Sequence, residues 1–125
     1  MKEEVRALRA PLPSGPYSQG LRVDGWIFVS GQGPVDSTSG AIVGTTIEQQ
    51  TQATLENVRA ILEAAGATIN DVVKVTAHLK TMGDFERFNA EYAKVFSDPK
   101  PVRTTVGSEL IDILVEIDVI ARLPE

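Results

Sequence analysis

Two charged side chains stand in segments that are otherwise apolar and rich in β-branched residues. Arg103 lies in the stretch KPVRTTV and Glu116 in VEIDVIA. The composition of these stretches predicts two strands, 102–106 and 113–121. Burying a charge is costly unless an opposite charge or a polar ligand meets it. We therefore expect each of these two side chains to meet a charged or polar group.

The two residue types can each make strong polar contacts. The planar guanidinium of Arg103 can hold a carboxylate through two parallel hydrogen bonds and stays charged. The carboxylate of Glu116 lies on a neighbouring strand or across a subunit boundary and can accept a proton as a general base. The alternative is a buried Arg103–Glu116 ion pair that only sets the register of the strands.

Period-2 alternation divides the side chains of these strands between two faces. Arg103 and Thr105 share a face of the first strand, so the Thr105 hydroxyl can also bond a ligand held by the arginine. On the second strand, Glu116 and Asp118 lie opposite the apolar residues Val115, Ile117 and Val119. Asp118 is expected to have a structural or interface role.

The middle of the chain predicts two helices and a strand. An apolar stripe of period near 3.6 predicts a helix over 47–65, with a capping box from Thr45 and Glu48. Aromatic residues at helical spacing predict a second helix over 85–96. Between them, 71–80 alternates as a strand, and its polar face carries the single histidine, His78, which we interpret as an ordinary surface residue without metal partners.

The N-terminal third predicts a strand around 5–8, a proline-fixed loop over 10–20 and a hairpin of 21–23 with 26–30. Asp24-Gly25 between the last two strands is a strong hairpin signal. The glycines of the following SGQGP stretch let backbone N–H groups face a ligand, or form a bulge.

The predicted order β-β-β-α-β-α-β-β is typical of an α+β domain, here one domain over 1–125, with two helices on one face of a mixed sheet. Strand 113–121 is apolar on both faces apart from its two acids, so it requires cover on both. The helices cover one face only. We therefore predict an oligomer in which another copy covers the second face.

Composition excludes several classes of protein. The net charge is −5 and no run of lysine or arginine occurs, which argues against nucleic-acid partners. The chain has no cysteine, no HxH or HExxH pattern and no apolar stretch of about 18 residues. We expect a cytoplasmic protein without a secretory signal, a membrane segment or a cysteine metal site.

Seven motifs occur in the order GPYSQG, FVSGQGP, LENVRAILEAAG, DVVKVTAHLK, DFERFNAEYAKVF, KPVRTTV and VEIDVIA. Together they cover most of the chain, which resembles the RidA/YjgF family of reactive-intermediate deaminases. The resemblance implies a chorismate-mutase-like α+β fold, a homotrimer with sites at the subunit clefts, and enamine/imine deaminase activity without metal or cofactor. It implies that Arg103 holds the substrate carboxylate and that Glu116 lies beside the attacking water. It further implies a pocket lined by Tyr17, Ser30, the Gly31 backbone and Asn89.

The implied substrates are 2-aminoacrylate and 2-iminopropanoate, small imino acids that would be hydrolysed to 2-oxo acids and ammonia. Two departures bear on substrate range: Thr105 replaces the cysteine of the best-studied members, and the linker 107–112 is about two residues shorter than theirs. Three alternatives stay open. They are deamination of an amino-dienoate such as 2-aminomuconate, non-catalytic binding of small carboxylates or proteins, and endoribonuclease activity.

Overall fold

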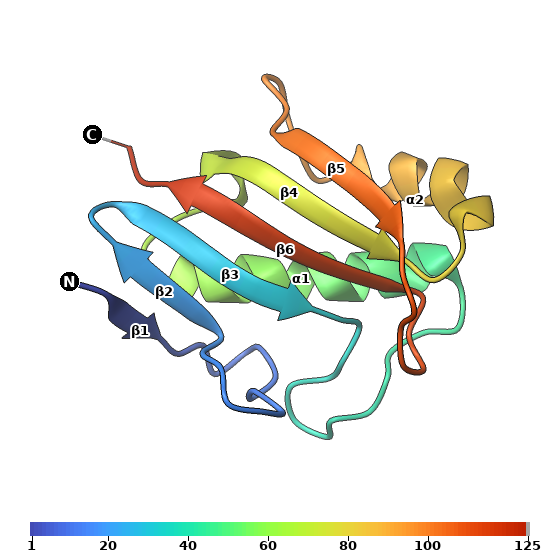
Figure 1. The fold of residues 1–125 in the computed structure, drawn as a ribbon, viewed down its shortest axis with the longest axis horizontal. Coiled ribbons are helices and arrows are strands. Elements are labelled where there is room, and N and C mark those ends of the chain that lie inside the picture. The colour runs from blue at the N-terminus through green and yellow to red at the C-terminus, as the bar shows by residue number, and fades with distance from the viewer. Residues whose placement is uncertain (125) are drawn as a thin grey trace.

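The computed structural model describes residues 1–124 and forms a six-stranded sheet in the order β1-β2-β3-β6-β4-β5 (Figure 1). β4 and β5 run parallel, and the other neighbours are antiparallel. The strands are β1 Glu3–Val5, β2 Gly20–Val23, β3 Trp26–Gln32, β4 Val72–Leu79, β5 Val102–Gly107 and β6 Val115–Arg122. The predicted mixed sheet and element order are confirmed.

Both helices lie on the same side of the sheet, behind it in Figure 1. α1 spans Ile47–Ala64 and α2 spans Phe85–Tyr92. The capping box was predicted one residue too early, because the side chain that accepts the first-turn N–H of Gln49 belongs to Thr46. α2 ends four residues before the predicted limit, although Phe96 remains buried in the core. Within residues 1–124, neither helix is long and apolar enough to cross a membrane.

The alternation predicted for β6 is confirmed and defines the core. Val115, Ile117 and Val119 are at most 1% exposed and face the helices. They pack with fully buried side chains of α1, β3, β4 and α2: Leu55, Val58, Ile61, Leu62, Ile27, Val75, Leu79 and Phe88. The opposite side of the sheet, here called the open face, carries half-exposed apolar groups such as Phe28 and Trp26.

The N-terminal strands agree with prediction in order, but their bounds differ: β2 begins one residue earlier, at Gly20, and β3 ends two residues later, at Gln32. The predicted hairpin is confirmed, with Asp24 at φ 49° and Gly25 at φ 84°, both positive as a two-residue type I′ turn requires. The first strand is Glu3–Val5 rather than 5–8. The side chain of Gln19 explains the shift, because it accepts a hydrogen bond from the Ala7 N–H at 2.7 Å and donates to the Ala7 carbonyl.

β5 and β6 are not neighbours, although they follow each other along the chain. β4 lies between them, and β5 is an edge strand of the sheet (Figure 1). Glu116 therefore does not lie on a strand next to that of Arg103, and this part of the prediction was wrong. The crossover through α2 returns the chain parallel to one edge of β4, and β6 pairs antiparallel with the other edge of β4 rather than with the free edge of β5.

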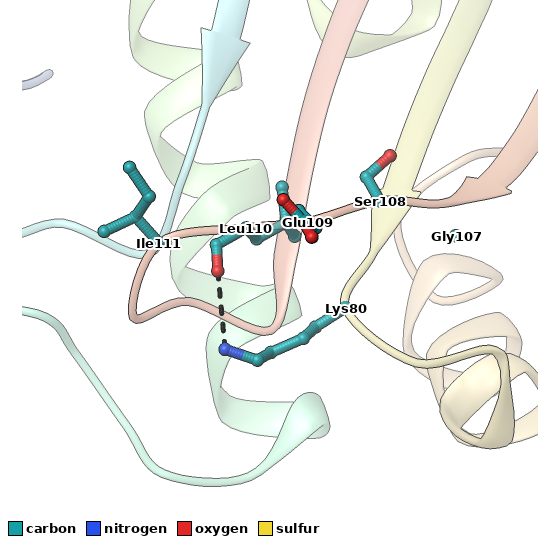
Figure 2. A pocket seen from close by; sticks show the side chains of 6 residues that line it. All are labelled: Lys80, Gly107, Ser108, Glu109, Leu110 and Ile111. Carbon is teal, nitrogen blue, oxygen red and sulfur yellow. Dashed lines mark hydrogen bonds between the residues drawn. The ribbon is translucent and has the colours of Figure 1, made fainter.

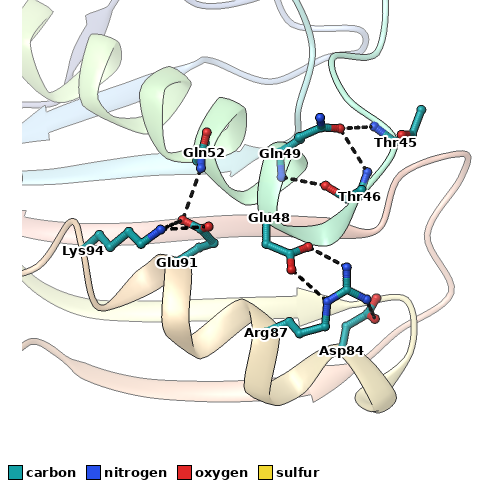
Figure 3. A network of polar contacts seen from close by, with 9 residues as sticks. All are labelled: Thr45, Thr46, Glu48, Gln49, Gln52, Asp84, Arg87, Glu91 and Lys94. Carbon is teal, nitrogen blue, oxygen red and sulfur yellow. Dashed lines mark hydrogen bonds and ion pairs between the residues drawn. The ribbon is translucent and has the colours of Figure 1, made fainter.

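Polar contacts hold α2 against α1 (Figure 3). The Arg87 guanidinium donates to both carboxylate oxygens of Glu48, at 2.9 and 2.7 Å. One turn further along α2, Glu91 accepts hydrogen bonds from Gln52 of α1 and from Lys94. These bonds fix the position of the helix that lies beside Arg103.

Candidate functional site

Arg103 projects from β5 toward the side of the sheet that the helices cover. Its register partner on β4 is Val75, and that of Thr105 is Ala77; both partners are fully buried under the helices. The predicted shared face of Arg103 and Thr105 is therefore observed. Because β5 is an edge strand, Arg103 itself remains partly exposed.

Helix α2 provides both an apolar floor and one hydrogen bond for the guanidinium. The guanidinium carbon lies 4.6 Å from the Tyr92 ring centroid, 5.4 Å from that of Phe88 and 5.8 Å from that of Phe85. Nη2 donates to Asn89 Oδ1 at 2.7 Å. Stacked cations of this kind are stabilised by the ring quadrupoles and keep their N–H edges available for an anion.

No carboxylate in residues 1–124 forms an ion pair with Arg103. Burial raises the pKa of Tyr92, with the positive charge of Arg103 opposing the shift, so its phenol stays neutral and supplies no counter-charge. The Thr105 hydroxyl is buried and has no hydrogen-bond partner among the described residues. Asn89, Arg103 and Thr105, called the arginine half-site below, thus hold one uncompensated positive charge and one unused hydroxyl.

Glu116 lies on the open face, with His78 of β4 as its register partner. Its side chain rests on the backbone of β3 at Gly31. A Cβ placed on Gly31 would come within 2.9 Å of Glu116 Cδ, so only glycine leaves room for the carboxylate in this position. Gly31 lies in the stretch between Val29 and Gln32 where the β3–β6 register shifts.

A hollow of about 320 Å³ is lined by Tyr17, Ser30, Gly31, Glu116 and Asp118. Ser30 is fixed there by a 2.6 Å hydrogen bond from its hydroxyl to the Ser18 carbonyl. The Tyr17 hydroxyl lies 3.2 Å from the Ser14 hydroxyl. Tyr17, Ser30, Gly31 and Glu116 therefore form a second group, called the glutamate half-site below, which the structure brings together.

One chain does not bring the two half-sites together. Arg103 shares the helix-covered side of the sheet with Val75, whereas Glu116 shares the open face with His78. The alternative of a buried Arg103–Glu116 pair within one chain is thus wrong. Alternation in the sequence could not reveal this separation. It shows which residues of one strand share a face, but not which faces of two different strands lie on the same side of the sheet.

Sequence reasoning missed the residues that shape the loops around the glutamate half-site. Buried Gln19 uses its amide nitrogen to bind the backbone carbonyls of Ala7, Ala10 and Pro11. Asn57 of α1 donates to the carbonyls of Gly33 and Val35, both at 2.9 Å. A buried amide within a helical stripe was the available signal for Asn57, since a buried polar side chain requires partners.

His78 lies on the open face, as predicted, but takes part in a defined contact. Its Nδ1 is 2.8 Å from Ser108 Oγ, and its Nε2 is 4.0 Å from Asp118 Oδ2. Burial raises the pKa of Asp118, while His78 and Lys74 oppose the shift. These contacts fasten the start of the 107–112 linker to the sheet.

The linker itself borders a wide hollow of about 690 Å³ between Lys80 and residues 107–111 (Figure 2). Lys80 Nζ reaches the Leu110 carbonyl at 3.4 Å across it. This hollow contains none of the predicted site residues. Its volume alone therefore gives it no chemical role.

Comparison with known proteins places the chain in a family. Residues 7–123 match the family model described as Endoribonuclease L-PSP. A RutC family protein of Pyrococcus horikoshii is 46% identical, covering 97% of this chain and 98% of its own length. The 2-iminobutanoate/2-iminopropanoate deaminase of Salmonella typhimurium is 37% identical, covering 97% and 98%.

The fold is shared as well. The crystal structure of Escherichia coli TdcF with bound serine superposes with a TM-score of 0.91 at 32% identity, over 98% of this chain and 99% of that one. The fold therefore agrees with that of TdcF over nearly the full length of both chains. The chain belongs to the RidA/YjgF family, which includes imine deaminases.

Proposed function

We propose that this protein is an enamine/imine deaminase that hydrolyses intermediates of the 2-aminoacrylate/2-iminopropanoate type to 2-oxo acids and ammonia. The observation that carries the proposal is Arg103, a cation supported by aromatic rings and an amide but not paired with any carboxylate of residues 1–124. Such a group binds a small carboxylate well. The deaminase name of the Salmonella relative and the serine bound to TdcF agree with a small amino-acid-like ligand.

The working site is proposed to lie between two copies of the chain in a homotrimer. The arginine half-site of one copy would face the glutamate half-site of the next, since one chain holds them on opposite sides of its sheet. Contacts between different surfaces of identical subunits form a ring when the rotation closes, and three copies make the smallest such ring. Exposed apolar groups on the open face, such as Phe28 at 41% and Val102 at 66%, would be covered by this contact.

The reaction needs only positioning and one proton acceptor. With the carboxylate held by Arg103, a water attacks the imine carbon and its oxygen bonds to that carbon, while Glu116 takes the proton. The π electrons of the carbon–nitrogen bond move to nitrogen, which receives that proton from Glu116, so that a carbinolamine forms. Glu116 then takes the remaining hydroxyl proton and passes it to the nitrogen, the carbon–nitrogen single bond breaks, ammonia leaves and the carbonyl of the 2-oxo acid forms.

Subunit complementation tests both the chemistry and the shared site. Arg103→Ala and Glu116→Gln should each remove most of the acceleration of 2-aminoacrylate decay, about a hundredfold for the loss of the base. Mixed trimers of the two variants, purified through a different tag on each variant, should regain about one third of the wild-type sites. A ring with two copies of one variant and one of the other has a single interface at which an intact arginine half-site faces an intact glutamate half-site.

The matched control pairs Arg103→Ala with the double variant Arg103→Ala/Glu116→Gln, which supplies no intact arginine and should stay inactive. No recovery in the first mixture would contradict the shared site. No acceleration by the wild-type protein would contradict deamination itself. RNA cleavage that depends on Glu116, measured with the same variants, would favour the endoribonuclease alternative instead.

A further inference from the structure

The single histidine of the chain lies directly opposite the proposed general base. His78 of β4 and Glu116 of β6 are register partners, and both side chains lie on the open face. Residues that lie directly opposite each other in an antiparallel pair have Cβ atoms about 5 Å apart. A positive charge on the imidazole therefore acts on the Glu116 carboxylate at short range.

Both nitrogens of the imidazole already have neighbours that hold the ring in one orientation. Nδ1 lies 2.8 Å from Ser108 Oγ, and Nε2 lies 4.0 Å from Asp118 Oδ2. A serine hydroxyl can donate to a neutral ring nitrogen and can accept from a protonated one. While Nδ1 accepts from the hydroxyl, the neutral ring carries its hydrogen on Nε2, toward Asp118. Protonation therefore changes the charge of His78 and leaves the ring in place.

Two carboxylates face the ring from β6. Glu116 lies opposite His78, and Asp118 lies on the diagonal, opposite Thr76. Asp118 also lines the hollow of about 320 Å³ that contains Glu116. The side chains of His78 and Asp118 are 29% and 42% exposed, so water screens the charges of this cluster only in part. A proton on the ring is therefore felt by both acids.

The other neighbours of the ring do not compensate this charge. β5 places the uncharged Val106 opposite His78. On the same face of β4 and just beyond it, Lys74 opposes the rise in the pKa of the neighbouring aspartate, and the ammonium of Lys80 reaches a linker carbonyl at 3.4 Å. Within residues 1–124, the acids of the 107–112 linker form no ion pair with the ring.

Glu116 leans away from the ring in this structure. Its carboxylate rests on the backbone of β3 at Gly31, and β3 and β4 lie on opposite sides of β6. An imidazolium at position 78 stabilises the negative charge of Glu116 and so makes it a weaker base. It also attracts the carboxylate toward β4 and away from Gly31. Both effects slow the removal of a proton from water.

We propose that His78 is a positioning residue that makes the deaminase sensitive to pH. The neutral imidazole leaves Glu116 on Gly31 as an active base, and the imidazolium reduces its activity. This assignment rests on the proposed function, because it takes Glu116 as the proton acceptor. Histidine is the side chain that usually changes its charge between about pH 5 and 8, and the chain has one histidine and no cysteine.

The pH profile of kcat tests the proposal. An excess of an enzyme that generates 2-aminoacrylate supplies the substrate at each pH between about 5 and 8, and the acceleration of its decay is measured. We expect the wild-type kcat to fall about threefold to tenfold on acidification. KM should change little, because the arginine half-site holds the carboxylate.

Two substitutions at position 78 separate charge from structure. His78→Gln cannot be protonated but can still bond Ser108, so it should keep the high kcat over the whole range. His78→Lys carries a fixed positive charge and should keep the low kcat of the acidic wild type at every pH. Leu8→Lys is the control, since it adds the same charge at a side chain that is 98% exposed, and it should retain the wild-type profile.

The outcomes distinguish this proposal from the proposed function. Titration of the substrate or of the generating enzyme appears equally in wild type and His78→Gln, so the ratio of their kcat values isolates His78. A constant ratio from about pH 5 to 8 would overturn the role of His78 and leave the deaminase intact. No acceleration by the wild type at any pH would overturn the deaminase, and the role of His78 with it.

The state of assembly is followed by size-exclusion chromatography at each pH. A fall in wild-type kcat that coincides with a loss of subunits would also overturn the role of His78. If His78→Lys does not assemble, the ratio of wild type to His78→Gln decides the question by itself.

Discussion

The two half-sites differ in how the fold supports them. The guanidinium of Arg103 is held from below by aromatic rings and from the side by Asn89, all from one helix that is itself bonded to α1. The carboxylate of Glu116 rests on a glycine backbone on an uncovered face, bordered by loops. The arginine half-site is thus organised by the core, whereas the glutamate half-site depends on close approach between two strands. Changes beneath Arg103 should act mainly on binding, and changes around Glu116 on the chemical step.

The largest effect should come from the guanidinium. Arg103→Lys keeps the charge but loses the planar two-bond geometry and the stacking, so we expect kcat/KM to fall by about two orders of magnitude, with Arg103→Ala lower still. Steady-state assays with an enzyme that generates 2-aminoacrylate measure this. Full activity of Arg103→Lys would show that a point charge is enough and that the aromatic floor has no catalytic value.

The next effect concerns the glycine under Glu116. Gly31→Ala should push the carboxylate away rather than break the sheet, because the nearest clash is with a side-chain atom. We expect about a tenfold loss of kcat with little change in the thermal midpoint. Gly83→Ala is the control, since its added Cβ would meet only Thr81 Oγ1, at 3.4 Å. Unchanged activity of Gly31→Ala would mean that the position of Glu116 is not critical.

A smaller effect is expected at the phenol beneath Arg103. The Tyr92 hydroxyl is buried without a partner among the described residues, and burial raises its pKa. Tyr92→Phe keeps the ring and removes an unsatisfied polar group, so stability should rise by up to about 1 kcal/mol. Activity should stay within about twofold of wild type. Denaturant unfolding and kinetics check both values, and a large loss of activity would indicate that the hydroxyl contacts the substrate or another subunit.

The smallest effect concerns the bond between the helices. Hydrogen bonding to Arg87 lowers the pKa of Glu48 in the folded state. The bond to Arg87 therefore stabilises the folded protein fully above the pKa of an unfolded glutamate, about 4.3. This stabilisation is lost as the pH falls through the lower pKa of folded Glu48. Glu48→Gln should lower the thermal midpoint of unfolding slightly at pH 7. The difference in thermal midpoint between variant and wild type should disappear at about pH 3. A difference that persists in acid would show that packing, not charge, explains it.

Much of the fold could be predicted because local rules decide it. The 3.6-residue stripe of α1, the period-2 pattern of β6 and the Asp24-Gly25 turn each reflect short-range geometry, and all three are present. Apart from the one-residue shift of the capping box, the errors discussed occur where distant residues decide the outcome. Gln19 binds the backbone at Ala7, and the first strand ends before it, at Val5.

Residue types and alternation by themselves determined that Arg103 and Thr105 share one face and that Glu116 lies opposite the core residues of its strand. The order of strands, the aromatic floor from α2 and the contact of Glu116 with Gly31 were decided only by the tertiary structure. The physical reason is that alternation is a property of one strand, whereas the insertion of β4 between β5 and β6 follows from how the crossover helix packs against the sheet. That insertion is what separates the two charges within a single chain.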